Sequence, residues 1–376
     1  MAPIRVGLIG LSASHGDVGM GTWGVHAHLK SLLSSPDYEI TAICNSSVDS
    51  AQRSIESHGL PDSVKAYGDP EDFANDPNVD LISVSVNVAK HLLLTKPALL
   101  QGKDVFVEWP LGASLKETQE LVQLARDHGS RTIVGLQLRV DPLLAKVREL
   151  LHNGAIGKVT SSVVWGTSNG VVDKGFPLDG TYYLDMKSGG NDFYIHFGHF
   201  LDGFTSVVGD FDTIQAKLQS QVTTVPLLNL ATGEVVEPAH PKTSPDHILV
   251  QGILKSEAAA SIVFRRVSSA IDDEGIRWLI TGSEGEIEIV IPGIGTHAQI
   301  ANPGRTLRLR SGGGKTQNVS FDQPEPEYIS SVPHIGSNTA RLYKGFAENA
   351  GGYADFESAL KTYELLERIV QEAKYI

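Results

Sequence analysis

The stretch Ile4–His28, which reads IRVGLIGLSASHGDVGMGTWGVHAH, determines how the rest of the chain is interpreted. It opens with Ile4–Ile9, an apolar run with few polar interruptions, as expected for a parallel strand that is buried on both faces. Gly10 follows directly, and a helix is expected to begin near Trp23. A strand, a glycine turn and a helix in this order favour a dinucleotide site, because such a turn brings backbone N–H groups to a pyrophosphate.

The glycine spacing in this turn departs from the usual dinucleotide fingerprint. Glycines would be expected at position 10 and at the positions of Ser12 and His15, but only Gly10 is present. Later glycines indicate a longer and looser loop: Gly16, Gly19, Gly21 and Gly24. We expect the nucleotide to contact Gly10, Ser12, Ser14, His15 and Trp23. The alternative is a loop that only holds the helix against the strand.

Strand and helix patterns alternate through the first 140 residues. We expect strands at Tyr38–Cys44, Leu81–Val86, Asp104–Glu108 and Thr132–Leu138, and helices at Ser47–His58, Ala89–Gln101 and Ser114–His128. Ser114 is suited to cap the last of these helices and Gly129 to end it. This repeated βαβ order predicts a doubly wound parallel sheet, a Rossmann dinucleotide-binding domain over residues 1–140.

The pattern changes in the second part, residues 141–376. Strands without intervening helices are expected at Thr213–Val222, His247–Leu254, Ala258–Val267, Ile276–Thr281 and Glu286–Ile291. They predict an α+β domain with a mostly antiparallel open sheet, for substrate binding and dimerisation. The final helix, Phe356–Lys374, has an apolar stripe that should pack back on the body, and Asn302–Pro326 should be the most mobile stretch. A sheet face without helices also favours a homodimer.

Composition narrows the classes of function. The 376 residues carry a formal net charge of −13, which argues against direct binding to nucleic acid or to an anionic membrane. The single cysteine, Cys44, excludes an internal disulfide, and no Cys or His cluster has zinc spacing, so we expect no metal. No apolar run approaches the length of a membrane span, and the first strand leaves no room for a signal peptide. We expect a cytoplasmic protein, or a nuclear one if it is a regulator.

The end of the second strand is where a nicotinamide cofactor is usually selected. An acidic residue there would bind a ribose 2′-hydroxyl, but the chain has Asn45, Ser46 and Ser47. These small polar side chains could accept a 2′-phosphate, with Arg53 as a counter-charge. Helix capping by the serines explains the same residues. We expect NADP or NAD, with NADP preferred.

Several later segments resemble the Gfo/Idh/MocA oxidoreductase family: Asn87–His91, Gly102–Pro110 and Gly189–Gly190 followed by His199 and Asp202. Their order and spacing agree over nearly the whole chain. Within the family, Val107–Trp109 and Pro241–His247 resemble the branch that contains the fungal galactose-regulon repressor, a non-enzymatic NAD(P)-binding regulator. The resemblance implies that Asn87, His91, Glu108 and Trp109 lie at the cofactor, and it also implies a homodimer.

Family members oxidise a sugar-like alcohol, which requires a base for the hydroxyl proton. The family pattern has a lysine after the glutamate and an aspartate four residues before a histidine, and this chain has Trp109 and Ile195 there. His199 is then the principal candidate for the base. His196, which shares a helix face with His199 if this segment is helical, Tyr183 and Lys187 are the others. Each histidine has a purely structural role as the alternative.

The resemblance also implies substrate contacts from Trp109, Arg139, Tyr182, Asp185 and Asp202. Trp109 is explained equally well as a stacking platform or as a space-filling residue. For Arg139 the alternative is a surface ion pair, and for Tyr182 the alternative is a place in the hydrophobic core. Three functions are thus open: an NAD(P)-dependent oxidoreductase with altered acid–base residues, a catalytically silent regulator that binds a protein partner, and a lyase or hydrolase that retains its NAD.

Overall fold

The computed structural model describes residues 2–16, 21–169, 175–295 and 297–375. By its internal contacts the chain divides into a first unit, Met1–Val140 with Pro324–Tyr363, and a second unit, Asp141–Gln323 with Glu364–Ile376. The expected break after residue 140 therefore coincides with a unit boundary. The expected continuous second domain does not match the contacts, because residues 324–363 pack within the first unit.

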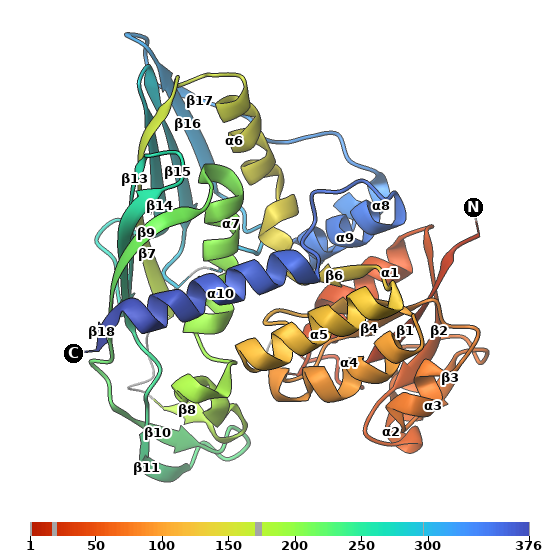
Figure 1. Cartoon of the computed structure of the whole chain (residues 1–376). Coiled ribbons are helices and arrows are strands. Elements are labelled where there is room, and N and C mark those ends of the chain that lie inside the picture. The colour runs from red at the N-terminus through yellow and green to blue at the C-terminus, as the bar shows by residue number, and fades with distance from the viewer. Residues whose placement is uncertain (1, 17–20, 170–174, 296, 376) are drawn as a thin grey trace. The chain divides into compact units, whose positions relative to one another are not determined.

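The first unit contains a six-stranded parallel sheet in the order β3-β2-β1-β4-β5-β6 (Figure 1). Its strands are β1 (Ile4–Ile9), β2 (Tyr38–Cys44), β3 (Lys65–Tyr67), β4 (Leu81–Val84), β5 (Asp104–Val107) and β6 (Thr132–Val134). The predicted doubly wound α/β fold is confirmed. β6 is shorter than expected, because Leu138 belongs to the 3₁₀ turn η3 (Gln137–Val140) instead of the strand.

Helices connect these strands: η1 (Gly24–Leu29, a π-helix), α1 (Lys30–Ser34), α2 (Val48–Ser57), α3 (Pro70–Ala74), η2 (Val88–Lys90), α4 (His91–Leu100) and α5 (Leu115–His128). The sequence signals act locally as expected in α5. The Ser114 side chain accepts a hydrogen bond from the Glu117 N–H, and Gly129 ends the helix at a φ of 68°.

The first unit is completed by residues from the C-terminal part of the chain, namely α8 (Glu327–Ser330), α9 (His334–Ala347) and the beginning of α10 (Phe356–Glu372). Leu342, Tyr343 and Phe346 of α9 are buried in one core cluster with Val6 and Leu8 of β1. The large side chains of α9 thus cover a sheet whose own helices leave this part of the core open.

The second unit is built on a nine-stranded sheet in the order β17-β16-β15-β14-β7-β13-β12-β9-β18. Its strands are β7 (Val159–Asn169), β9 (Phe211–Gln219), β12 (His247–Leu254), β13 (Ala259–Val267), β14 (Glu274–Gly282), β15 (Gly285–Pro292), β16 (Thr306–Ser311), β17 (Gln317–Asn318) and β18 (Ala373–Tyr375). Most neighbouring pairs are antiparallel, and the pairs β7–β13 and β18–β9 are parallel. The predicted mostly antiparallel sheet is confirmed.

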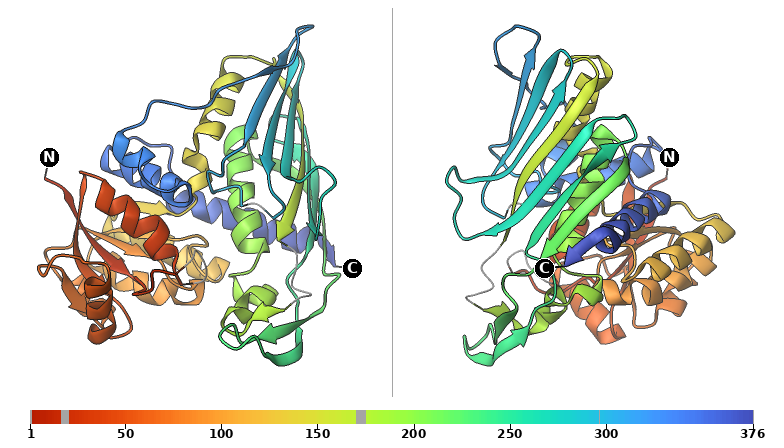
Figure 2. Two further views of the ribbon diagram at one scale, coloured as in Figure 1. Left: turned by 180° about the vertical axis from the view of Figure 1, so that it is seen from behind. Right: turned by 60° about the vertical axis from the view of Figure 1, so that its left-hand side comes forward.

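Helices α6 (Pro142–His152) and α7 (Gly198–Val208) lie on one face of this sheet (Figure 2). Phe204 of α7 stacks on Trp278 of β14 at 5.3 Å between ring centroids and on Phe211 of β9 at 5.9 Å. Phe200 packs against Phe264 of β13. These aromatic contacts form the core of the second unit and fix the beginning of α7 against the sheet.

Other parts of the second unit were not expected from the sequence. Strands β7, β16 and β17 were missed, and the last two lie in the stretch 302–326 that was predicted to be the most mobile. A small sheet joins β8 (Phe176–Pro177), β10 (Thr224–Leu228) and β11 (Val235–Pro241). The final helix ends at Glu372 and continues as β18. Its expected stripe is buried apart from Leu360, which is partly exposed.

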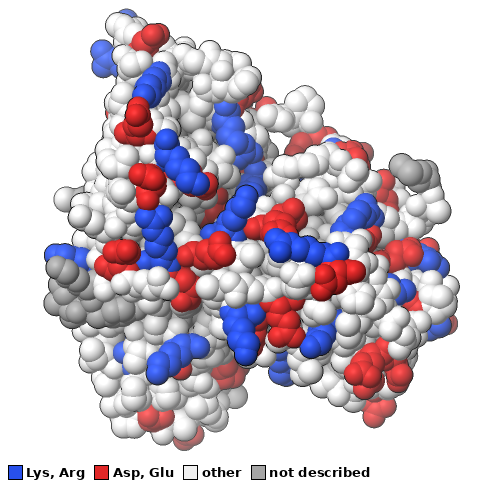
Figure 3. Space-filling model, in the orientation of Figure 1, with Lys and Arg blue, Asp and Glu red and all other residues white. Residues whose placement is uncertain are grey.

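Acidic and basic side chains are interspersed on the face shown in Figure 3, and neither sign forms a large continuous patch there. Across the described helices, no segment combines the length and the apolar character needed to cross a membrane.

Candidate functional site

In the first unit, the loop after β1 is held by hydrogen bonds that take up its carbonyl groups. The Leu11 carbonyl accepts from Asn45 Nδ2 at 2.9 Å and from Ser54 Oγ at 2.7 Å. The Ala13 carbonyl accepts from Ser57 Oγ at 2.7 Å, and the Ser12 carbonyl lies 2.7 Å from His58 Nε2. These carbonyl oxygens are engaged in hydrogen bonds to α2 and to the end of β2. They therefore repel a nearby anion less, and the N–H groups of the loop can bind it.

Gly10 is required where β1 enters this loop. Its φ is +91°, a conformation that L-residues rarely adopt. A Cβ added there would lie 2.4 Å from Val86 Cγ1 and 2.5 Å from the Ser85 carbonyl oxygen. The close approach of the loop to the end of β4 fits a bound dinucleotide, since the pyrophosphate of such ligands lies against this turn.

The remaining loop residues of the sequence prediction are placed as follows. Ser14 N–H donates to Ser12 Oγ, and His15 Nε2 lies 2.9 Å from Ser57 Oγ, so both residues stabilise the loop itself. Trp23 precedes η1 and is partly exposed. Gly19 lies outside the described residues.

The three polar residues that follow β2, Asn45, Ser46 and Ser47, have different roles. Asn45 Nδ2 is also within 3.2 Å of the Ser50 carbonyl, so its amide holds the loop to α2. Ser47 caps α2 by accepting from Ser50 N–H. Ser46 and Arg53 are also exposed, so a 2′-phosphate could reach both side chains.

Glu108 stands at the carboxyl end of β5 in a buried hydrogen-bond network. Its Oε1 lies 2.7 Å from Nε2 of His28, which is fully buried. His28 Nδ1 lies 2.8 Å from the Tyr343 hydroxyl, and that hydroxyl donates to Ser83 Oγ at 3.0 Å. Gly135 leaves the space for the carboxylate, because a Cβ there would lie 2.2 Å from Glu108 Oε2. The network fixes a carboxylate at the sheet edge where doubly wound folds bind ligands.

Three further predicted cofactor residues surround this edge. His91 is buried, with Nδ1 2.8 Å from the Pro110 carbonyl and Nε2 3.1 Å from the Val86 carbonyl, so it joins the loops that follow β4 and β5. Burial lowers its pKa. Asn87 is exposed and caps η2. Trp109 is buried and packs edge-on against Tyr363, a contact that a space-filling residue would make.

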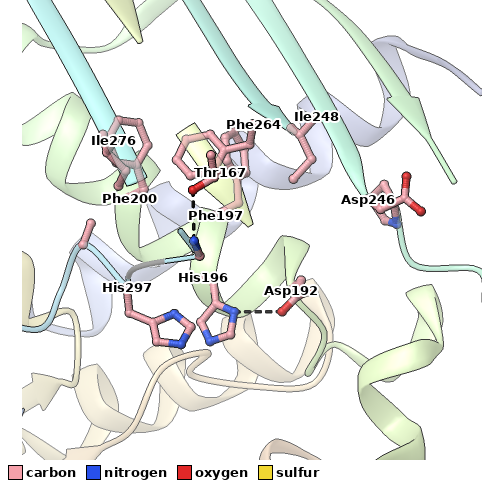
Figure 4. Close-up of a pocket in the computed structure, with 13 residues that line it drawn as sticks. Thr167, Asp192, His196, Phe197, Phe200, Asp246, Ile248, Phe264, Ile276 and His297 are labelled. Carbon is pink, nitrogen blue, oxygen red and sulfur yellow. Dashed lines mark hydrogen bonds and ion pairs between the residues drawn. The ribbon is translucent and has the colours of Figure 1, made fainter. Parts of the chain in front are cut away.

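The second unit contains a pocket with an apolar wall and a polar mouth (Figure 4). Aromatic and branched side chains form the wall: Phe197, Phe200, Ile248, Phe264 and Ile276. The polar lining residues include Asp192, His196 and His297, which are partly exposed at the mouth, and Asp246, which is buried. Thr167 lies deeper and ties the strand β7 to the loop after β15, since its Oγ1 accepts from the Gly295 N–H at 3.0 Å.

Asp192 and His196 form a directed pair at this mouth. His196 Nδ1 lies 2.8 Å from Asp192 Oδ1, and the side chains are 28% and 35% exposed respectively. Burial acts to raise the pKa of Asp192, but its hydrogen bond with His196 and the neighbouring positive charges hold that pKa below its usual value. The carboxylate is therefore ionised near neutral pH and accepts the hydrogen bond from Nδ1.

His297 lies against His196, with ring centroids 3.9 Å apart and the ring planes tilted by 34° (Figure 4). Burial and the nearby charge of His196 lower the pKa of His297 to about 3, so this ring is neutral at physiological pH. Sequence reasoning missed Asp192 and His297. Asp192 could have been found, because it precedes His196 by the four residues that the family pattern requires between aspartate and histidine, whereas nothing in the sequence links His297 to this segment.

His199, the principal sequence candidate, is 4% exposed in α7 and is not among the residues that line the described pocket. Its Nδ1 is buried without a hydrogen-bond partner. Burial and the charges of His196 and His297 hold its pKa well below the usual value. His199 is thus a buried, neutral imidazole, and its predicted catalytic role stays a prediction.

The other predicted residues are dispersed. Tyr183 lies beside His196 at 6.1 Å between ring centroids and 4.9 Å from Tyr182, and burial raises the pKa of both tyrosines. Lys187 is exposed, and Asp185 caps η5 (Met186–Ser188) by accepting from the Lys187 N–H. Asp202 is fully buried in α7, and Arg139 is partly buried in η3.

Lys242 and Asp246, from the distinctive segment Pro241–His247, form a buried pair with 3.5 Å between Nζ and Oδ2. Asp246 also accepts hydrogen bonds from the Gln221 and Val222 N–H groups. The segment therefore fixes one side of the pocket. Among the described residues, no group of three or more His, Cys, Asp or Glu side chains is arranged to hold a metal ion.

Comparison with known proteins agrees with both units. Residues 4–136 match the family model of oxidoreductases with an NAD-binding Rossmann fold, and residues 142–290 match the model of the Gal80p C-terminal domain. The dehydrogenase aclE of Aspergillus oryzae is 31% identical over 303 residues, which cover 78% of this chain and 79% of the relative. The chain belongs to the Gfo/Idh/MocA family.

Within the Gfo/Idh/MocA family the chain resembles the galactose-regulon repressors. The galactose/lactose metabolism regulatory protein GAL80 of Kluyveromyces lactis is 31% identical over 264 residues, 68% of this chain. The match spans only 56% of that regulator's own length. The structure of a super-repressor mutant of Gal80p from Saccharomyces cerevisiae superposes with a TM-score of 0.84 at 24% identity and covers 99% of this chain and 96% of that one, so the two share their fold.

Proposed function

We propose that the protein is an NAD(P)-dependent oxidoreductase that acts on a small-molecule alcohol or carbonyl compound. The observation that carries this proposal is the pocket mouth of the second unit, where Asp192, His196 and His297 lie together. A hydrogen-bonded carboxylate–imidazole pair beside a pocket is an arrangement that suits proton transfer. Interconversion of an alcohol and a carbonyl requires a group of this kind to move the hydroxyl proton.

The first unit supports the cofactor part of the proposal. Gly10 lets the turn lie close against the end of β4, and the loop carbonyls are bound elsewhere. A nicotinamide nucleotide, when bound, supplies the hydride acceptor or donor. Ser46 and Arg53 are exposed, and Asn45 stands in place of an acidic residue directly after β2; both observations support NADP over NAD. The cytoplasmic location expected from the sequence is part of the same proposal.

Calorimetry with NADP and NAD tests the cofactor. We expect micromolar affinity with NADP the tighter ligand, and an Arg53→Ala variant that loses this preference. Gly10→Ala should weaken both nucleotides at least tenfold, because the added Cβ meets the Ser85 carbonyl. Gly21→Ala is the matched control, since Gly21 has a similar φ of +83° but no atom within 4 Å of an added Cβ. No heat with either nucleotide at millimolar concentration would contradict every cofactor-based function.

A screen of activated carbonyl compounds with NADPH and NADH, followed by absorbance at the nicotinamide band, tests the reaction. We expect at least one compound to be reduced at a rate proportional to protein concentration. If Gly10→Ala turns over at the wild-type rate once the nucleotide is saturating, the substitution affects nucleotide binding and not the reaction. Complete silence with tight nucleotide binding would refute the oxidoreductase function.

A second candidate is a catalytically silent, nucleotide-binding regulator with a protein partner. It is favoured by the match of residues 142–290 to the Gal80p C-terminal domain and by the apolar residues Trp109 and Ile195 at the two positions noted above. If no compound is turned over and one partner protein is captured only in the presence of nucleotide, the regulator function is supported over the oxidoreductase function.

A further inference from the structure

We propose that His15, His26 and His58 form a proton-coupled anion site around the loop after β1, which attracts the phosphate groups of a nucleotide more strongly as the three imidazoles take up protons. The inference rests on the nucleotide binding proposed above and assigns the positive charge of that site to three side chains. The described part of the loop, residues 10–16, contains no Lys or Arg that could pair with a phosphate.

Two of the rings hold carbonyl groups of the loop from neighbouring helices. His58 Nε2, at the end of α2, lies 2.7 Å from the Ser12 carbonyl oxygen. His26 Nε2, in η1, lies 2.9 Å from the Gly16 carbonyl oxygen. A carbonyl oxygen can only accept a hydrogen bond, so each Nε2 carries a hydrogen. The neutral rings therefore have their lone pair on Nδ1.

His15 belongs to the loop and holds it to α2. Its Nε2 lies 2.9 Å from the carbonyl oxygen of Ser57 and 2.9 Å from Ser57 Oγ. The Ser57 hydroxyl donates to the Ala13 carbonyl, so its oxygen can only accept from His15. His15 thus has the same tautomer as the other two rings. Among the described residues, no group makes a hydrogen bond to Nδ1 of any of the three.

A proton can be added at each Nδ1 without loss of the hydrogen bond at Nε2. The loop keeps its conformation while the positive charge around it rises, and a charged ring donates a stronger hydrogen bond to its carbonyl group. His15 and His58 lie edge-on with ring centroids 4.6 Å apart, so two positive charges there repel each other. A bound phosphate offsets this repulsion and favours the second proton. Nucleotide binding is therefore accompanied by proton uptake.

The other charged groups of the surrounding elements differ from the three rings in type or in burial. They are Asp49, Arg53 and Glu56 of α2, Asp62 after it and Lys30 of α1, all exposed, and the buried pair of His28 and Glu108. Among the described residues, none of these groups forms an ion pair with the three rings. Histidine is the side-chain type that ordinarily changes charge between about pH 5 and 8. His28 is the remaining histidine here, and the variants below distinguish it from the three rings.

The size of the effect follows from Coulomb's law. A ring bonded to a loop carbonyl lies within about 8 Å of an anion on the N–H groups of the same loop. One positive charge at this distance tightens the binding of one negative charge about twofold in water and about thirtyfold at an effective dielectric constant of about 20. Three partly exposed rings and a doubly charged pyrophosphate give a combined gain of about tenfold at low salt.

Calorimetry with NAD tests the site. NAD is the probe because its pyrophosphate keeps a constant charge, whereas the 2′-phosphate of NADP titrates near pH 6. We expect the affinity to rise about tenfold from pH 8.0 to pH 5.5, and we expect 1 M salt to abolish most of this rise. Titrations at pH 6.5 in buffers of different ionisation enthalpy should show a net uptake of protons by the complex.

The triple variant His15→Gln, His26→Gln and His58→Gln removes the charge and keeps a hydrogen-bond donor at about the position of each Nε2. We expect it to bind NAD like the wild type at pH 8.0, and to lose both the gain at pH 5.5 and the proton uptake. His128→Gln is the matched control, because His128 is an exposed histidine of the same unit at the end of α5, where β6 begins, at the sheet edge opposite the loop. It should retain both effects.

The outcomes separate this inference from the function on which it rests. No heat from the wild type with NAD or NADP at any pH overturns the nucleotide binding. Binding with equal affinity at pH 5.5 and 8.0 and without proton uptake overturns the inference alone. Proton uptake that persists in the triple variant assigns the proton to another group, such as His28, and also overturns it. If the triple variant does not fold, each single variant should still lose part of the gain, and three single variants with the full gain overturn the inference.

Discussion

Gly135→Ala is a direct test of the network around Glu108. The added Cβ would lie 2.2 Å from Glu108 Oε2 and 2.6 Å from Cδ, far inside ordinary van der Waals contact. Gly135 is not in the left-handed region, so the substitution probes space and not backbone strain. Either the carboxylate leaves His28, or the chain around Gly135 shifts.

The free-energy cost of each response can be estimated. Loss of a hydrogen bond to a charged group costs about 1.5–3 kcal/mol, and overpacking of a filled site costs about 1–3 kcal/mol. The molecule takes the less costly response, so the free energy of unfolding of the first unit should fall by about 2 kcal/mol. Native-state hydrogen exchange of the β5 and β6 amides in urea measures this locally.

A double-mutant cycle identifies the cause. Removal of the carboxylate in Glu108→Ala removes the atoms that the new Cβ would meet, so Gly135→Ala should cost less than about 0.5 kcal/mol in that background. Gly313→Ala, where no atom lies within 4 Å of an added Cβ, is the control for a glycine-to-alanine change. An equal cost of Gly135→Ala with and without Glu108 would refute the reasoning.

Two further predictions concern stability and assembly. Burial alone would raise the pKa of Asp76, but hydrogen bonds from the Asn78 N–H, Tyr67 and Lys65 lower it to about 2 from 3.8. Since the folded pKa of Asp76 is depressed, its ionised carboxylate contributes about 2 kcal/mol of stability above pH 4, and this contribution is lost as the pH falls from about 4 toward 2. Asp76→Asn should therefore flatten the curve of unfolding free energy against pH in this range. Asp62→Asn, at an exposed position, is the control and should not. The face of the nine-stranded sheet opposite α7 exposes the side chains of Trp165 and Ile253. We expect a second copy of the chain to cover this face in a homodimer. A mass near 40.4 kDa in light scattering, the mass of one chain, would contradict this expectation.

The architecture was largely predictable because it depends on local patterns. Buried parallel strands read as apolar runs, and the cap at Ser114 and the stop at Gly129 act over a single helical turn. Strand β7 was missed because its polar residues, among them Ser161 and Ser162, hide the alternation that identifies a half-buried strand. In such a strand the sheet neighbours, and not the local sequence, decide the conformation.

The candidate site was less predictable for a related reason. Glu108 could be located because it ends a recognisable strand. Tyr343, which contacts its partner His28, comes from α9, which no local pattern connects to β5. The roles of Asn45 and Ser47 in holding the loop and capping α2 were available as alternatives, and only the three-dimensional contacts distinguish them from ligand binding. His297 likewise meets His196 only through the folding of the sheet.

The use of α9 to complete the first unit has a consequence for how the chain is made. Residues 1–140 leave the ribosome long before Leu342, Tyr343 and Phe346, which fill the core beside β1 and β2. The nascent first unit therefore waits with part of its apolar core uncovered while all of residues 141–323 are synthesised. Factors that bind exposed apolar segments during translation have their longest opportunity in this interval, and a chain truncated before α9 would remain their substrate.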